Sequence, residues 1–285
     1  MAAPDRFKYL KIALTRPHRY RWYRAITMGS TLAVLLAVPL LGVARMDLWG
    51  GGHLALGKPV NFAKGLVGVC LAMGAFYVVT FAVNLPAGRM FCGFGCPVGQ
   101  LSRYADAIDA FPKDPARRRR GWLELVAFAF ALSLAVSLWW VAPAALVAWP
   151  AGLVVWGAVA LVTGYGIVHG RYWRWGFCRK LCPIGLYYSV VQTNSLIGID
   201  FDPTGTCTDC EGCEGVCPVG LDPRHLDTLV PSPGGLAFAG FPGMNHCLHC
   251  GACVEVCEHL TRKAGGPAAM GFRRLGRRHA PVARA

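Results

Sequence analysis

The sequence has few charged residues for its size. Of its 285 residues, 15% are charged and 54% are hydrophobic, a composition that excludes an ordinary soluble globular domain. A helix that crosses the hydrocarbon core of a bilayer, about 30 Å thick, needs roughly 20 apolar residues. Four stretches are long and apolar enough, at residues 25–44, 65–85, 122–141 and 144–168. The sequence therefore predicts four transmembrane helices.

Histidine is absent from these stretches. Helical bundles that bind haem need axial ligands inside their helices. His169, at the end of the fourth stretch, is the only histidine in or next to one of them. This excludes a haem ladder across the membrane. The sequence also lacks a nucleophile triad, a phosphate-binding loop and a paired-carboxylate site, so nothing supports hydrolytic or phosphoryl-transfer chemistry.

Positive charge is in excess but unevenly distributed. The formal net charge is +14, and basic residues gather before the first stretch, between the second and third, and after the fourth. The loop between the first two stretches has only Arg45, Lys58 and Lys64, and the turn "WVAPAA" has no basic residue. Because basic loops stay on the cytoplasmic side, both termini are predicted to be cytoplasmic, in a multi-pass protein of the bacterial inner membrane. This topology accounts for the charge, and nucleic acid is not an expected partner.

Thirteen cysteines are present, and the cytoplasm keeps thiols reduced, so we interpret them as ligands rather than as disulfides. Eight follow the last span in two runs, "CTDCEGCEGVC" and "CLHCGACVEVC", each with the spacing C-x2-C-x2-C-x3-C. Three thiolates two residues apart wrap a compact object, and Gly212 and Gly251 let the backbone approach it. An iron-sulfur cubane fits this pattern, whereas a single tetrahedral zinc leaves too many sulfurs over.

The two runs resemble those of bacterial two-cluster ferredoxins. In that family the fourth cysteine of each run binds the other cluster. The resemblance implies two 4Fe-4S clusters with crossed ligands: Cys207, Cys210, Cys213 and Cys257 for cluster 1, and Cys247, Cys250, Cys253 and Cys217 for cluster 2. One departure is that Pro218 follows the first run, whereas Glu258 stands where the second proline would be.

A second cysteine pattern is duplicated in the membrane part. "FCGFGCPVG" at residues 91–99 is repeated as "FCRKLCPIG" at residues 177–185, each after the second span of a pair. Proline favours the first position of a helix, so Cys96 and Cys182 are expected just before new helices. A helix N-terminus and nearby basic residues such as Arg89 predict easily ionised thiols. The candidate catalytic residues are therefore Cys92, Cys96, Cys178 and Cys182. They act as redox-active dithiols or as a further iron site, and a purely structural role is the alternative.

Four spans, two C-x3-C-P motifs and a two-cluster ferredoxin pattern together resemble the NapH type of membrane ferredoxin-like proteins. This group includes MauN-type relatives in methylamine utilisation and is similar in its membrane core to NosR and CcoG proteins. The resemblance implies an iron-sulfur protein that relays electrons between the quinol pool and a respiratory or dehydrogenase partner. The sequence leaves open whether the chain is itself a quinol dehydrogenase. A CcoG-like assembly factor that reduces a metal for another enzyme, or a subunit whose clusters only stabilise it, are alternatives.

The predicted fold is an α-helical membrane protein, four transmembrane helices in two duplicated hairpins, followed by an α+β ferredoxin domain with two clusters. The predicted boundaries are a basic cytoplasmic N-terminus at 1–24, a membrane domain at 25–192, a ferredoxin domain at 193–265 and a basic tail at 266–285.

Overall fold

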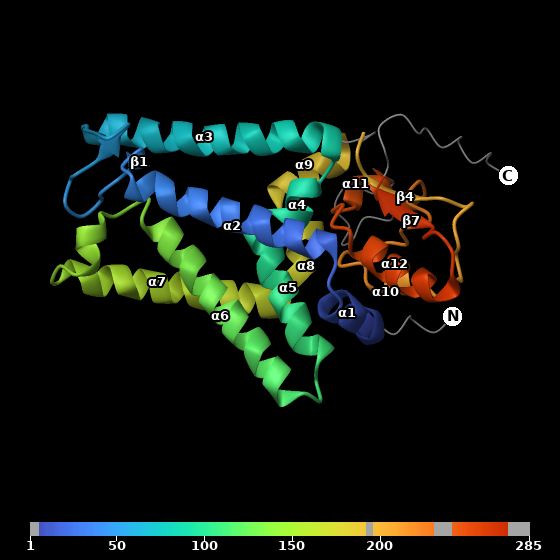
Figure 1. Ribbon diagram of the computed structural model, residues 1–285. Coiled ribbons are helices and arrows are strands. Elements are labelled where there is room, and N and C mark those ends of the chain that lie inside the picture. The colour runs from blue at the N-terminus through green and yellow to red at the C-terminus, as the bar shows by residue number, and fades with distance from the viewer. Residues whose placement is uncertain (1–5, 192–195, 231–240, 273–285) are drawn as a thin grey trace. The chain divides into compact units, whose positions relative to one another are not determined.

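The computed structural model describes residues 6–191, 196–230 and 241–272, and it is mostly helical (Figure 1). Four helical segments are long and apolar enough to cross a membrane: α2 (Arg19–Leu40), α3 (Phe62–Ala87), α6 (Pro115–Ser137) and a fourth that begins with α7 (Ala151–Val168). The prediction of four helices of spanning length is confirmed. Many of their apolar side chains are exposed, as expected for surfaces that face lipid.

The ends of all four spans differ from the prediction, as the first and the fourth illustrate. The first helix begins at Arg19, six residues before the predicted start, and ends at Leu40. The fourth does not begin at residue 144, because a short 3-10 turn, η1 (Pro143–Leu146), precedes α7. Pro143 and Pro150 have no backbone N–H to donate, so a continuous α-helix does not run through them.

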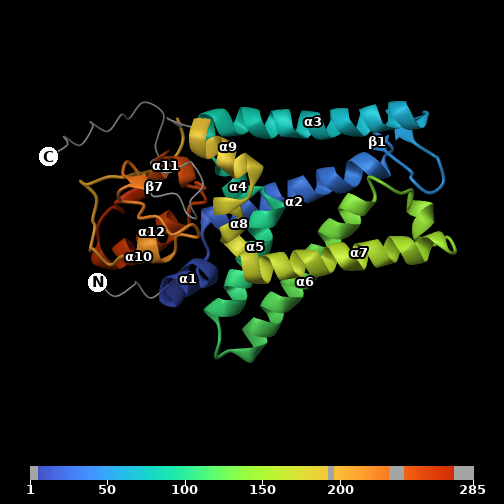
Figure 2. The ribbon, with the colours of Figure 1, turned by 180° about the vertical axis from the view of Figure 1, so that it is seen from behind.

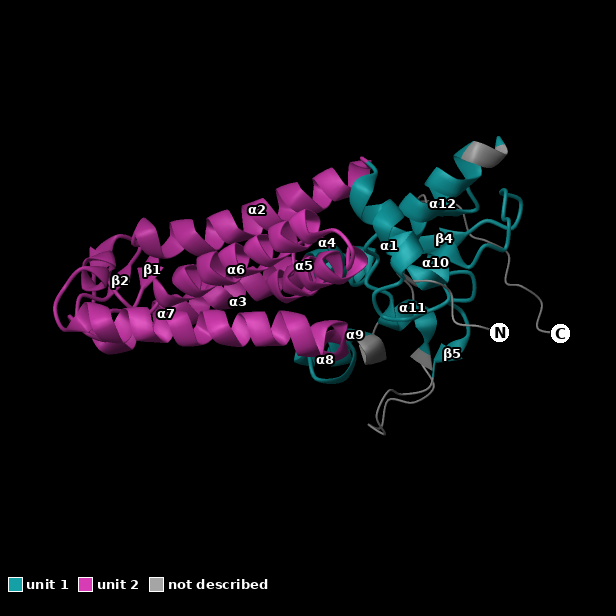
Figure 3. Ribbon diagram, turned by 90° about the horizontal axis from the view of Figure 1, so that it is seen from below, with its two compact units in different colours: residues 1–16, 83–93, 179–285 teal, residues 17–82, 94–178 magenta. Residues whose placement is uncertain are grey.

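The chain forms two compact units, which Figure 3 shows in different colours. The first, here called the membrane unit, comprises Pro17–Ala82 and Phe94–Cys178. The second, here called the cysteine-rich unit, comprises Met1–Arg16, Val83–Gly93 and Arg179–Ala285. The cysteine-rich unit therefore includes the end of α3 and the first two residues of the first C-x3-C-P motif, which were predicted to belong to the membrane domain. The predicted domain boundaries stay predictions.

In the membrane unit, α5 (Pro97–Ala110) packs against α6, and α6 packs against α7. Leu101, Ile108, Leu125 and Ala129 form their shared core. Gly170 allows a close approach, because a Cβ there would lie 3.2 Å from the Leu101 carbonyl oxygen. At one end of the unit a small antiparallel sheet has the order β1 (Ala44–Arg45), β2 (Leu54–Ala55) and β3 (Lys58–Pro59).

Buried polar contacts fix α5 to the segment that follows α7. A π-helical turn, η2 (His169–Trp173), leads into α8 (Arg174–Lys180). The indole Nε1 of Trp175 donates to Asp106 Oδ2 at 2.7 Å, and Arg174 forms ion pairs with Asp106 and Asp109. Because Asp106 is only 6% exposed, its carboxylate needs these partners. The contacts therefore hold the residues just before Cys178 in a defined place.

The cysteine-rich unit is built from short elements, drawn from behind in Figure 2. Its helices are α1 (Arg6–Thr15), α4 (Met90–Phe94), α9 (Pro183–Val191), α10 (Gly212–Gly215), α11 (Gly243–His246) and α12 (Ala252–Ala264). Its strands pair antiparallel as β4 (Ile199–Phe201) with β7 (Met270–Phe272), and β5 (Leu229–Val230) with β6 (Phe241–Pro242). Helix α12 packs against α10 and β7, and α1 contacts both α10 and α12. The sequence had assigned no structural role to α1.

Candidate functional site

The eight cysteines of the two runs line two cavities, four to each. The first, here called the exposed cavity, is lined by Cys207, Cys210, Cys213 and Cys257. The second, here called the buried cavity, is lined by Cys217, Cys247, Cys250 and Cys253. The fourth cysteine of each run therefore lies at the cavity of the other run.

The two runs share one backbone conformation. Asp209 and His249, each just before the second cysteine of its run, have φ angles of 47° and 49°. Glu211 and Gly251, each just after that cysteine, have φ angles of 55° and 76°. Left-handed residues on both sides of the second cysteine curl the loop, so that the first three cysteines of each run line one cavity. The same loop conformation therefore occurs in both runs.

Burial separates the two cavities. Cys207 and Cys210 are exposed, whereas Cys247, Cys250 and Cys253 are buried. Burial raises the pKa of cysteines at both cavities, of Cys213 to about 12 and of Cys217 to about 11. A bound metal centre would supply positive charge that stabilises their thiolates.

The sulfurs surround space rather than one point. Among the described residues, no group of three or more His, Cys, Asp or Glu side chains lies close enough together to hold a single metal ion. Four sulfurs around one cavity match a multi-atom centre instead. An all-cysteine donor set is the one that iron-sulfur clusters use, so the residues present fit such a cluster.

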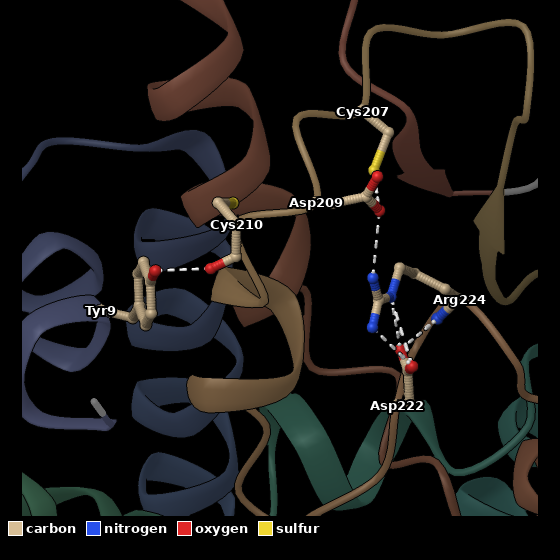
Figure 4. A network of polar contacts seen from close by, with 6 residues as sticks. All are labelled: Tyr9, Cys207, Asp209, Cys210, Asp222 and Arg224. Carbon is tan, nitrogen blue, oxygen red and sulfur yellow. Dashed lines mark hydrogen bonds and ion pairs between the residues drawn. The ribbon is translucent and has the colours of Figure 1, made fainter. Parts of the chain in front are cut away.

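Tyr9 and Arg224 support the exposed cavity (Figure 4). The Tyr9 hydroxyl, on α1, donates to the carbonyl oxygen of Cys210. The Arg224 guanidinium bonds Asp222 at 2.9 Å and reaches Asp209 at 3.4 Å. Burial raises the pKa of the Asp222 carboxyl, but the hydrogen bonds and charge of Arg224 outweigh it, so the net shift is downward. Neither Tyr9 nor Arg224 carries a signal in the sequence that marks it as part of the site.

The residues around α4 support the buried cavity within the same unit. A Cβ atom at Gly93 would overlap the Leu248 carbonyl oxygen and lie 2.8 Å from Cys250 Cα. Arg89, 2% exposed, donates from Nη1 to the His246 carbonyl oxygen at 3.4 Å. The ring of His249, which is fully buried, has its Nδ1 2.9 Å from the Ala87 carbonyl oxygen. Part of the first C-x3-C-P motif therefore packs directly against the loop that carries Cys247 and Cys250.

The helices predicted after the C-x3-C-P motifs are present. Cys96 is the N-cap of α5 with Pro97 in the first turn, and α9 begins at Pro183, directly after Cys182. Cys92 and Cys182 lie in the cysteine-rich unit, close enough for their charges to interact. Cys96 and Cys178 belong to the membrane unit, so the convergence of all four cysteines stays a prediction.

The easy ionisation predicted for Cys96 and Cys182 stays a prediction. At the neighbouring Cys92, burial raises the pKa of the thiol, and the charge of Arg89 only partly offsets that increase. Desolvation outweighs a single neighbouring cation here because a thiolate loses its hydration inside the protein.

Known proteins that are similar to this chain are themselves ferredoxin-type proteins. The chain is 28% identical to the ferredoxin-type protein NapH of Haemophilus influenzae, over 86% of this chain and 89% of the relative. It is 27% identical to the methylamine utilization ferredoxin-type protein MauN of Methylorubrum extorquens, over 72% and 76% of the two chains. It is 30% identical to the MauN protein of Paracoccus denitrificans, over 70% and 76%.

The chain belongs to the NapH and MauN family of ferredoxin-type proteins. Membership makes it a membrane iron-sulfur protein of electron transport, as its four spanning helices and cysteine runs indicate. No family model and no solved structure matches the chain. Within this NapH and MauN setting, the cysteine-lined cavities are the candidate sites of electron transfer.

Proposed function

We propose that the chain relays electrons between the quinol pool and a respiratory or dehydrogenase partner through two 4Fe-4S clusters. Cluster 1 is held by Cys207, Cys210, Cys213 and Cys257, and cluster 2 by Cys247, Cys250, Cys253 and Cys217. The observation that carries the proposal is the crossed grouping of these cysteines around two separate cavities. When bound, each cluster supplies a one-electron carrier.

The residues around the cavities have separable roles in this proposal. Left-handed residues such as Glu211 and Gly251 shape the two binding loops. Tyr9 and Arg224 brace the exposed cavity, while Gly93 allows α4 to cover the loop of the buried one. The crossed cysteines tie the two runs together, so losing one fourth cysteine affects the cavity formed by the other run.

We further propose that Cys92, Cys96, Cys178 and Cys182 form the point where electrons from quinol enter, either as dithiols or around a further iron site. The proximity of Cys92 to Cys182 supports this role, as does the contact between α4 and the Cys247–Cys250 loop. The proposal also includes two duplicated helix pairs, cytoplasmic termini and a bacterial inner-membrane location, all supported by the repeated motif and the basic loops.

The test uses the full chain, purified anaerobically in detergent. A quinol analogue should reduce the clusters, and dithionite serves as the control reductant. Cys96→Ser and Cys182→Ser should each slow quinol-driven reduction by about tenfold or more, leave dithionite reduction intact, and be scarcely worse when combined. Cys70→Ser, outside both motifs, is the matched control.

The outcome separates the alternatives. Unchanged quinol-driven reduction in the double variant would remove the four motif cysteines from the relay. Clusters that no quinol analogue reduces in the wild type would contradict the quinol role itself. Metal reduction that proceeds without quinol would favour the CcoG-like assembly function.

A further inference from the structure

Arg89 has no assigned role in the proposed electron relay. It lies between α3 and α4 in the cysteine-rich unit and is only 2% exposed. Its Nη1 donates to the carbonyl oxygen of His246, the residue just before Cys247. The backbone N–H of Gly93, next to Cys92, donates to the Arg89 carbonyl oxygen at 3.2 Å. Arg89 therefore contacts both the first C-x3-C-P motif and the loop that begins at Cys247.

The guanidinium lies inside the protein and close to the buried cavity. Its hydrogen bond to the His246 carbonyl oxygen places it one residue from Cys247, which lines that cavity. Since Arg89 is shielded from solvent, its field at this loop is screened less than that of a surface arginine.

We propose that Arg89 is a positioning residue that raises the reduction potential of cluster 2 and holds Cys92 beside the loop of that cluster. The inference rests on the proposed function, because it requires the two clusters. Reduction adds one negative charge to the site, and a fixed buried cation stabilises the reduced form more than the oxidised form. Net charge and hydrogen bonds near the sulfurs are established determinants of cluster potential.

The effect is expected to be specific to the buried cavity. Arg89 contacts the loop that begins at Cys247, whereas the ion pairs of Arg224 with Asp222 and Asp209 lie at the exposed cavity. Arg179, the counterpart of Gly93 in the second motif, lies near the same cavity, with its Nη1 3.7 Å from where a Cβ at Gly220 would be, but is exposed to solvent. Arg179 therefore provides a matched control: a nearby arginine whose charge is screened.

The test is redox-poised EPR of the full chain, with iron counted in every sample. Cys207→Ser and Cys247→Ser variants assign the two cluster signals. Arg89→Gln should lower the ratio of reduced to oxidised cluster 2 about tenfold at a fixed potential, a shift of about 59 mV for a one-electron couple. Cluster 1 should be unchanged, Arg89→Lys should restore most of the potential, and Arg179→Gln should have little effect.

Three results would overturn the inference: equal shifts in the potentials of both clusters, no shift in either, or an equal shift in Arg179→Gln. If both clusters are intact in these variants, the proposed function still stands. If Arg89→Gln loses about four irons, Arg89→Lys decides: eight irons retained supports the role of the charge, and iron loss there too assigns Arg89 to packing alone. A wild type without clusters would refute the proposed function instead.

Discussion

The two cavities have similar cysteine loops but differ in solvent exposure and in the residues that support them. Both are lined by four cysteines, and both use left-handed residues around the second cysteine of a run. The exposed cavity has two cysteines open to solvent and is braced by polar side chains, Tyr9 and Arg224. The buried cavity has three buried cysteines and is covered by backbone contact with Gly93 and by Arg89.

The difference matches the needs of a relay. A carrier that delivers electrons to a partner protein needs a centre near its surface, whereas a carrier that receives them from within the same chain needs a centre beside the donor. The exposed cavity meets the first need, and the buried cavity, which contacts the first C-x3-C-P motif, meets the second. We therefore expect a substitution at one cavity to affect the cluster there and to spare the cluster at the other cavity.

The largest effect should come from neighbouring cysteines that serve different cavities. Cys213→Ser and Cys217→Ser are four residues apart on one run, yet they line the exposed and the buried cavity respectively. Each should lose about four irons, but the EPR signal lost with Cys217→Ser should be the one lost with Cys250→Ser. If Cys213→Ser and Cys217→Ser remove the same signal, the crossed grouping is wrong.

Gly93→Ala should selectively damage the buried cavity. The new methyl group would meet the backbone of Leu248 and Cys250, which cannot move without shifting the cysteine loop. We expect loss of cluster 2, seen as about four irons missing, with cluster 1 retained. Gly176→Ala, where a Cβ meets no atom within 4 Å, is the matched control. A Gly93→Ala chain with eight irons and unaltered EPR would show that the close contact is unimportant.

Tyr9→Phe should weaken only the exposed cavity, and modestly. It removes the hydroxyl that donates to the Cys210 carbonyl, a contribution of about 1 kcal/mol. Thermal loss of the cluster 1 signal should therefore begin at a lower temperature, while cluster 2 is unaffected. Tyr172→Phe, at a side chain that is 76% exposed, controls for loss of a tyrosine hydroxyl. A matching change at cluster 2 would argue against a local role for α1.

The smallest effect concerns the two equivalent loop positions, Glu211 and Gly251. Both have positive φ, which costs an L-residue roughly 1 kcal/mol and costs glycine little. Glu211→Gly should stabilise the exposed loop by up to about 1 kcal/mol, and Gly251→Ala should destabilise the buried loop by a similar amount. Rates of iron loss to a chelator measure both. Changes in the same direction would mean that the two loops do not share one conformation.

The sequence predicted the parts of the site that spacing determines. Cysteines at fixed intervals predicted two loops, and proline after Cys96 and Cys182 predicted the starts of α5 and α9, which are confirmed. Contacts between distant segments have no such local pattern. The packing of α1 on α10 and of Gly93 on Cys250 depends on tertiary structure.

The sequence contains one indication of close packing that was not used to predict the site. The two motifs are repeats, yet one has Gly93 where the other has Arg179. A glycine at one copy of a repeat and a long charged side chain at the other indicates that only the first position is closely packed, as the structure shows for Gly93. The raised pKa of the Cys92 thiol has no such signal, since burial cannot be read from neighbours in sequence.

The central claim is that the two cavities hold two 4Fe-4S clusters, and metal and sulfide analysis of the anaerobically purified full chain tests it most directly. The account predicts about eight irons and eight acid-labile sulfides per chain, with two EPR signals on reduction. A preparation with about one zinc per chain and no labile sulfide would contradict it.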